Sequence, residues 1–186
     1  MPKRIGIAGY MGAGKTTCAR SFESGSALII DADAQAKLLM SGSRRLQDDL
    51  CGAFGASIVD KDGLRFDLLG RVAFRSAESL ISLNNIIHPP LIKHLERLVF
   101  DCTKSLCVLD AALIPLWGVE AWFDLCIWVD APFETRLERL KIKRADIDES
   151  ELIRRMRLQE EVMSVPDAGI WVRPALYLPS QDSINP

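Results

Sequence analysis

The segment from Gly9 to Thr16 reads Gly-Tyr-Met-Gly-Ala-Gly-Lys-Thr, and it constrains the fold of this chain more than any other feature. It fits the pattern G-x-x-x-x-G-K-[ST] and directly follows the apolar run 5–8. A strand, a glycine-rich turn and a helix start form a nest of backbone N–H groups that can cradle a phosphate. Lys15 can reach the β- and γ-phosphate oxygens, and the Thr16 hydroxyl can ligate Mg2+. The segment therefore predicts nucleotide binding rather than a purely structural glycine turn.

Short apolar runs alternate with helical patterns along the chain, which predicts an α/β fold with a mostly parallel sheet. Five strands are predicted, at residues 5–9, 27–30, 106–110, 125–129 and 170–172. Ligands of such sheets bind beyond the carboxyl ends of the strands. Three of these ends carry aspartates, namely Asp31 with Asp33, Asp110 and Asp130. The chemistry is therefore expected at this edge of the sheet, beside the phosphate-binding loop.

The 75 residues from Asp31 to Ser105 far exceed what a crossover between parallel strands needs. Their pattern is mostly helical, with turns at 41–43 and 62–63. We interpret this segment as an insertion that holds a phosphoryl acceptor over the γ-phosphate. A helical cap that only covers the sheet is the alternative.

Asp33 follows the second predicted strand and precedes the helical run 34–40. A carboxylate at this place can accept the proton of an acceptor hydroxyl and orient its oxygen toward the γ-phosphorus. The alternative is that Asp33 only caps the helix, since aspartate is a preferred N-cap residue. Asp31 points to the opposite side of an extended chain and is the weaker candidate for the base.

The segment 130–161 has the pattern of two helices joined by a polar turn. Asp130 can cap the first helix, with Pro132 in its first turn, and Asp148 starts a capping-box-like pattern for the second. Eight of the 23 Lys and Arg residues lie between Arg136 and Arg157. Two arginine-edged helices beside a phosphate-binding loop predict a lid that closes on the transferred phosphoryl group. The alternative is a solvated charged face.

Composition limits the partners and the compartment. A formal net charge of -2 argues against broad nucleic-acid binding, and no apolar stretch approaches the length of a membrane span. The five cysteines form no C-x-x-C pair, and their odd number favours a reducing cytoplasm over secretion or a zinc site. With 186 residues and 48% hydrophobic content, the chain can bury the core of a single domain.

Taken together, these motifs resemble the dephospho-coenzyme A kinase family. The matching pieces are the phosphate-binding loop, Leu28-Ile29-Ile30-Asp31-Ala32-Asp33, Phe54-Gly55, Asp62-Gly63, Leu83-Asn84-Asn85-Ile86-Ile87-His88-Pro89 and Arg155-Met156-Arg157-Leu158-Gln159. The resemblance covers about residues 5–165. It implies transfer of the ATP γ-phosphate, with Mg2+, to the ribose 3'-hydroxyl of dephospho-coenzyme A, the last step of coenzyme A biosynthesis.

The resemblance also implies roles for particular residues. ATP would be bound by the loop residues Gly12, Ala13, Gly14, Lys15, Thr16 and Thr17 and by Arg139 of the lid. Lys15 and Asp33 would be catalytic, and Asp33, His88 and Arg155 would contact the acceptor. Thr16 and, through water, Asp110 would hold Mg2+. For His88 the alternative is a histidine that fixes a turn before Pro89, and for Asp110 a purely structural carboxylate.

The architecture that the resemblance implies is a three-layer P-loop kinase fold in one domain, with a helical substrate subdomain and a lid. The nucleotide-binding core would comprise residues 1–33, 104–131 and 160–175, the acceptor-binding insertion 34–103, and the lid 132–159. We expect a monomer. Two readings compete with this kinase: a kinase of another small hydroxylated metabolite, such as a sugar acid or nucleoside, and a non-catalytic nucleotide-dependent switch or binding protein.

Three departures from the family pattern matter, and those at Leu116 and Phe66 keep the non-catalytic alternative open. The usual proline and acidic residue are missing from the segment 110–116, where Leu116 stands at the acidic position, and Phe66 stands where an arginine is expected. Arg65 could replace that arginine only if the backbone is shifted by one residue. The segment 173–180 contains two prolines, so a closing helix is not expected there.

Overall fold

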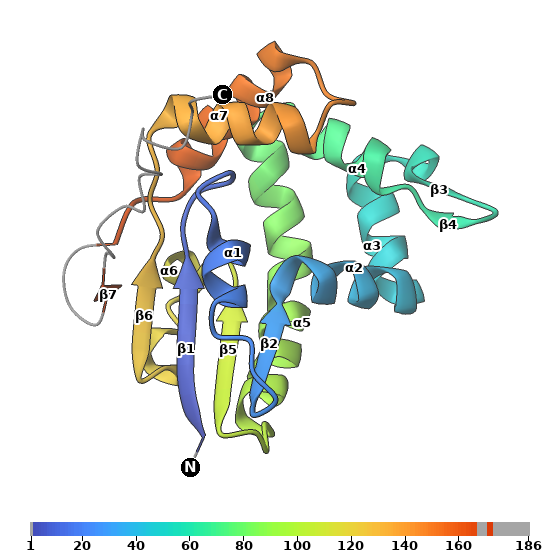
Figure 1. Cartoon of the computed structure of the whole chain (residues 1–186). Coiled ribbons are helices and arrows are strands. Elements are labelled where there is room, and N and C mark those ends of the chain that lie inside the picture. Colours follow the sequence, from blue (N-terminus) through green and yellow to red (C-terminus); the bar gives the residue numbers. More distant parts are fainter. Residues whose placement is uncertain (1, 167–170, 173–186) are drawn as a thin grey trace.

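A five-stranded parallel sheet forms the centre of the protein, seen here in a computed structural model that describes residues 2–166 and 171–172. The strands lie in the order β2-β5-β1-β6-β7 (Figure 1). They are β1 (Lys3–Ala8), β2 (Ala27–Asp31), β5 (Leu106–Asp110), β6 (Leu125–Trp128) and β7 (Trp171–Val172). The parallel α/β fold is thus confirmed, and the boundaries of the first four strands agree with the prediction to within two residues. Of the fifth predicted strand, Trp171 and Val172 are described and Ile170 lies outside the described residues.

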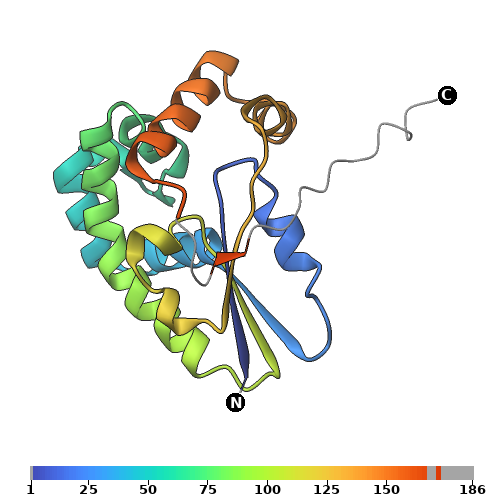
Figure 2. The ribbon, with the colours of Figure 1, turned by 90° about the vertical axis from the view of Figure 1, so that its left-hand side faces the viewer.

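Helices cover both faces of the sheet, which makes three layers (Figure 2). Alternate residues of β5 point to opposite faces: Val108 packs with Ala19 of α1 (Lys15–Arg20), whereas Leu109 belongs to the core cluster on the other face. That second cluster includes Leu91 and Leu95 of α5 (Ala77–Phe100). The sheet is therefore buried on both sides, as its apolar strands require.

The long segment between β2 and β5 is helical, as predicted, apart from one short hairpin. It contains α2 (Ala32–Gly42), α3 (Arg44–Phe54), the 3-10 turn η1 (Ala56–Ile58), the antiparallel strands β3 (Val59–Asp60) and β4 (Gly63–Leu64), α4 (Phe66–Ala73) and α5. The turn predicted at 41–43 is wrong for its first two residues, because α2 continues to Gly42 and only Ser43 separates it from α3. Of the turn predicted at 62–63, Asp62 lies in the turn of the hairpin and Gly63 already begins β4.

Helix α5 runs without interruption through Pro89 and Pro90. The turn that was considered before Pro89 is therefore absent, and that alternative for His88 is wrong. Prolines usually break a helix because they lack the N–H donor and crowd the preceding turn. Here the helix is held on both sides of the pair by buried residues, among them Leu80, Ile87 and Leu91.

Two helices lie above the carboxyl ends of the strands (Figure 1), α7 (Phe133–Lys143) and α8 (Glu149–Val162). Asp148 caps α8 as predicted, its side chain accepting from the Ser150 backbone N–H at 2.9 Å. The predicted cap of α7 is wrong, because Pro132 is the N-cap residue and the Asp130 carboxylate accepts from the neighbouring Ala131 N–H instead. Two short turns, α6 (Ile114–Trp117) and η2 (Glu120–Trp122), connect β5 to β6.

All five cysteines are free, and within residues 2–166 and 171–172 no helix is long and apolar enough to cross a membrane. The prediction that the segment 173–180 forms no helix falls outside the described residues.

Candidate active site

The loop between β1 and α1 requires glycine at two positions. Other residues rarely adopt the backbone conformation found at these positions, and at one of them a side chain would also clash with α7. Gly12 has φ +77°, and a Cβ added there would lie 2.6 Å from the Arg136 carbonyl oxygen. Gly14 has φ +107° and begins α1 as its N-cap. The Lys15 ammonium folds back over the loop and donates to the Tyr10 carbonyl at 3.2 Å. The loop therefore has the shape that brings backbone N–H groups and a lysine around a phosphate.

A hydrogen bond joins the loop to the end of β5. The Thr16 hydroxyl donates to Asp110 Oδ2 at 2.8 Å. Burial raises the pKa of the Asp110 carboxyl, while the Thr16 hydroxyl and the Lys15 ammonium act to lower it. The structure thus brings together two of the residues that sequence analysis placed around Mg2+.

Asp33 is free of the helix cap that competed with its role as a base. The cap of α2 is Asp31, whose Oδ1 accepts from the Ala34 N–H at 3.0 Å. Asp33 lies in the first turn of the helix, and its side chain is exposed. The carboxylates of Asp110 and Asp33 both raise the pKa of Lys15 against the larger, lowering effect of burial. Asp33, Asp110 and Lys15 therefore form one charged cluster at the carboxyl ends of β1, β2 and β5.

Arg139 reaches from helix α7, which was predicted to be part of a lid, to the phosphate-binding loop. Its Nη1 donates to the Ala13 carbonyl at 3.0 Å and lies 3.3 Å from the Gly12 carbonyl. The guanidinium group therefore lies against the phosphate-binding loop.

Arg136 does not belong to a solvated charged face, the alternative considered for this helix, since only 4% of its surface is exposed. It forms an ion pair with Glu160 of α8, and its guanidinium lies 5.0 Å from the centre of the Tyr10 ring. Its Nε donates to the Ala131 carbonyl at 3.1 Å. Arg136 thus joins α7, α8 and the phosphate-binding loop.

Helix α8 makes two direct hydrogen bonds with the same loop. The Tyr10 hydroxyl donates to the Met163 carbonyl just after the helix at 3.0 Å, and the Met11 N–H donates to Gln159 Oε1 at 2.8 Å. Sequence analysis named Gln159 only as the end of the stretch 155–159 that matches the family, and it assigned no role to Tyr10 or Glu160. These contacts make the position of α8 dependent on the loop.

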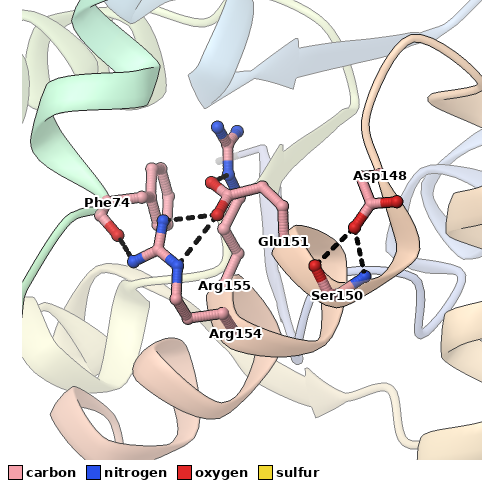
Figure 3. A network of polar contacts seen from close by, with 6 residues as sticks. All are labelled: Phe74, Asp148, Ser150, Glu151, Arg154 and Arg155. Atoms are coloured by element: carbon pink, nitrogen blue, oxygen red, sulfur yellow. Dashed lines mark hydrogen bonds and ion pairs between the residues drawn. The ribbon is translucent and has the colours of Figure 1, made fainter.

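Arg155 lies one turn before Gln159 on α8 and contacts Phe74 of the helical insertion (Figure 3). Its Nε donates to Glu151 Oε1 at 2.6 Å, and its guanidinium lies 5.0 Å from the Phe74 ring centre. Arg154 binds the other oxygen of Glu151 and donates to the Phe74 carbonyl. These arginines and Glu151 line a cavity of about 670 Å³ between α2, α4 and α8.

His88 packs edge-on against Trp117, with ring centroids 5.5 Å apart. Burial lowers the pKa of His88 to about 4, so the imidazole is neutral at pH 7. His88 is not among the residues that line the cavity beside Arg155. Its predicted contact with the acceptor stays a prediction.

The pH dependence of stability should reveal this burial. As the pH falls below about 6.5, the unfolded chain protonates His88, whereas the folded chain does so only near pH 4. The unfolded state therefore binds more protons in this window, and stability falls by about 1–2 kcal/mol after allowance for solvent screening. His88→Asn should lose this part of the pH dependence when the free energy of unfolding is measured at pH 7 and pH 4.5. Equal pH slopes in both proteins would contradict the prediction.

The residues that depart from the family pattern, together with Arg65 beside them, lie in different environments. Arg65 pairs with Asp67 at 3.3 Å and lies 3.8 Å from Asp60, and it does not line the cavity. Phe66 does line it, under the Lys37 ammonium at 5.9 Å from the ring centre. Leu116 is 46% exposed on α6. Phe66, and not Arg65, therefore faces this cavity.

Comparison with known proteins agrees with this geometry. A sequence model described as dephospho-CoA kinase matches residues 3–167. A dephospho-CoA kinase of Porphyromonas gingivalis is 32% identical over 89% of this chain and 81% of its own, and one of Corynebacterium diphtheriae is 35% identical over 73% and 70%. A crystal structure of a Thermus thermophilus protein superposes with a TM-score of 0.67 and 26% identity, over 95% of this chain and 91% of that one. The fold is also similar to a Campylobacter jejuni dephospho-CoA kinase, with a TM-score of 0.51 and 21% identity over 87% and 81%.

Proposed function

This chain belongs to the dephospho-CoA kinase family, and on that premise we propose that it transfers the γ-phosphate of ATP to the ribose 3'-hydroxyl of dephospho-coenzyme A. The products are coenzyme A and ADP. The observation that carries the proposal is the cluster of Lys15, Asp110 and Asp33 at the carboxyl ends of three neighbouring strands. It brings together a phosphate-binding cation and a free carboxylate, which phosphoryl transfer requires.

Asp33 acts as the general base in this mechanism. Its carboxylate accepts the proton of the 3'-hydroxyl while the hydroxyl oxygen attacks the γ-phosphorus and the bond to the β-phosphate oxygen breaks. Two facts support this role: Asp31 caps α2 in its place, and the Asp33 side chain is exposed to an incoming acceptor. The backbone from Gly12 to Thr17 binds the phosphates of ATP, and Lys15 neutralises charge on their β- and γ-oxygens.

The residues present suit Mg2+. Thr16 would hold the ion directly and Asp110 through water, and oxygen ligands of this kind, completed by substrate phosphates, are those that Mg2+ prefers. Among the described residues no group of three or more acidic, His or Cys side chains offers an all-protein metal cage. When bound, the ion neutralises the charge that develops on the transferring phosphate.

Arg139 binds ATP phosphates from the lid, since it already lies against the loop carbonyls. Arg155 and His88 serve the acceptor. The chain divides by these roles into a core of residues 1–33, 104–131 and 160–175, an acceptor-binding insertion of 34–103 and a lid of 132–159. We also propose that the protein is a monomer. A reducing cytoplasm is the proposed compartment, and the five free cysteines support it.

The test is ADP production by the purified protein with ATP, Mg2+ and dephospho-coenzyme A, beside a no-acceptor control and a panel of sugar acids and nucleosides. Turnover that depends on dephospho-coenzyme A and exceeds that with every panel member supports the proposal. Faster turnover with another hydroxylated metabolite would assign a different acceptor. Nucleotide binding without any acceptor-dependent turnover would favour the switch or binding protein.

A further inference from the structure

The cavity between α2, α4 and α8 carries positive charge that the protein itself does not neutralise. Six cationic and four acidic side chains line it, so two positive charges are left without a counterpart in the lining. Three of the cationic residues, Arg144, Arg154 and Arg155, pair with carboxylates in the cavity wall. The other three, Lys37, Arg71 and Arg75, have no ion-pair partner among the residues that the structure describes.

The four carboxylates of the wall are all engaged by other groups. Glu151 is shared by Arg154 and Arg155 (Figure 3), and Asp146 lies 3.6 Å from Arg144. Asp67 pairs with Arg65 outside the cavity, and Asp148 caps α8. The excess of cations is therefore available to a ligand with about two negative charges.

Lys37 places this charge beside the proposed base. It follows Asp33 by four residues on α2, so the two side chains lie on the same face of the helix, one turn apart. Its ammonium lies over the ring of Phe66, the first residue of α4. Arg71 comes from the last turn of the same α4. A group bound between Lys37 and Arg71 would thus extend away from an acceptor hydroxyl held at Asp33.

This cavity is separate from the place where ATP phosphates would bind. Neither Arg139 of α7 nor Lys15 nor any other residue of the phosphate-binding loop is part of its lining. Its volume of about 670 Å³ lies within the range of small-molecule sites. The cations therefore suit a second phosphate-bearing ligand rather than the phosphoryl donor.

We propose that Lys37 and Arg71 bind the 5'-diphosphate of the acceptor nucleotide and so select acceptors that carry it. The inference rests on the proposed function, because it takes the acceptor hydroxyl to lie at Asp33. The ring of Phe66 packs against the Lys37 ammonium. The family pattern expects an arginine at position 66, and in this chain Lys37 and Arg71 supply the positive charge of the cavity wall near that position. Charge-assisted hydrogen bonds to phosphate oxygens supply the selectivity.

Steady-state kinetics of Lys37→Met and Arg71→Met test this binding role. Each variant should raise KM for dephospho-coenzyme A by about 10- to 100-fold, with KM for ATP unchanged within about twofold and kcat changed by less than about threefold. Lys61→Met and Arg45→Met serve as matched controls, since both residues are exposed, lie in the insertion and do not line the cavity. The controls should leave both KM values unchanged.

Adenosine gives the decisive comparison, because it has the ribose hydroxyls but no diphosphate. As a competitor of dephospho-coenzyme A, it should have the same inhibition constant in the wild-type protein and in both cavity variants. An unchanged KM for dephospho-coenzyme A, or an equal loss for adenosine and dephospho-coenzyme A, would overturn the inference. Absence of wild-type turnover with dephospho-coenzyme A would instead refute the proposed function, and a thermal unfolding scan of each variant excludes loss of the fold as the cause.

Discussion

Asp33→Asn is expected to lower kcat by about 10²- to 10⁴-fold, which is the usual contribution of a general base. The asparagine side chain has nearly the same shape but does not accept the proton of the acceptor hydroxyl. ATP binding should survive, because Asp33 lies on α2 and outside the loop that cradles the phosphates. Acceptor-dependent ADP production, together with a separate measurement of ATP affinity, checks both expectations.

Asp31→Asn is the matched control for this change. It removes one negative charge two residues earlier on the same helix, yet asparagine caps helices as well as aspartate does, so α2 should remain intact. Asp31 also contributes to the field at Lys15, although less than Asp33. We expect kcat to stay within about fivefold of the wild-type value. If both variants lost activity equally, the effect would come from the local charge rather than from a base at Asp33.

Lys15→Met should lower kcat/KM by about 10²- to 10³-fold and leave the fold at least as stable as before. The activity falls because the ammonium neutralises phosphate charge that develops in the transition state. The stability is kept because burial lowers the pKa of Lys15, which means that the folded protein pays for holding this charge away from water. Kinetics and thermal unfolding of the same preparation measure the two effects.

Lys3→Met provides the comparison at the other end of β1, where the side chain is exposed. Lys3→Met should change neither kcat/KM nor thermal stability measurably. A Lys15→Met variant that keeps wild-type kcat/KM would contradict the role of Lys15, and one that loses both activity and stability would point to a structural role for its bond to the Tyr10 carbonyl.

The sheet and the phosphate-binding loop could be predicted because their signals are local. Each of the first four strands is a short apolar run that ends at a loop or an aspartate, and the loop glycines follow β1 directly. Local sequence signals could not decide whether Asp31 or Asp33 caps α2. Both residue types suit the position, and the extended backbone of Asp31, with φ -92° and ψ 109°, decides it.

Contacts between distant segments were beyond sequence reasoning. Tyr10 and Met163 are separated by 153 positions, and no sequence motif indicates that they are in contact. The burial of Arg136 was missed for the same reason, since a helical pattern of charges predicts exposure unless a partner such as Glu160 is known to lie opposite. The paired and unpaired cations of the cavity between α2, α4 and α8 likewise became distinguishable only through their three-dimensional neighbours.

The close packing at Gly12 limits which segments can be exchanged between related kinases to make chimeras. The missing side chain of this glycine makes room for the backbone of α7 at Arg136, and the neighbouring Met11 and Tyr10 are bound to α8 and to the residue that follows it. Helices α7 and α8 taken from a relative would therefore have to be transplanted together with residues 10–12. Chimeras joined between this loop and these helices should assemble poorly even when each half comes from an active enzyme.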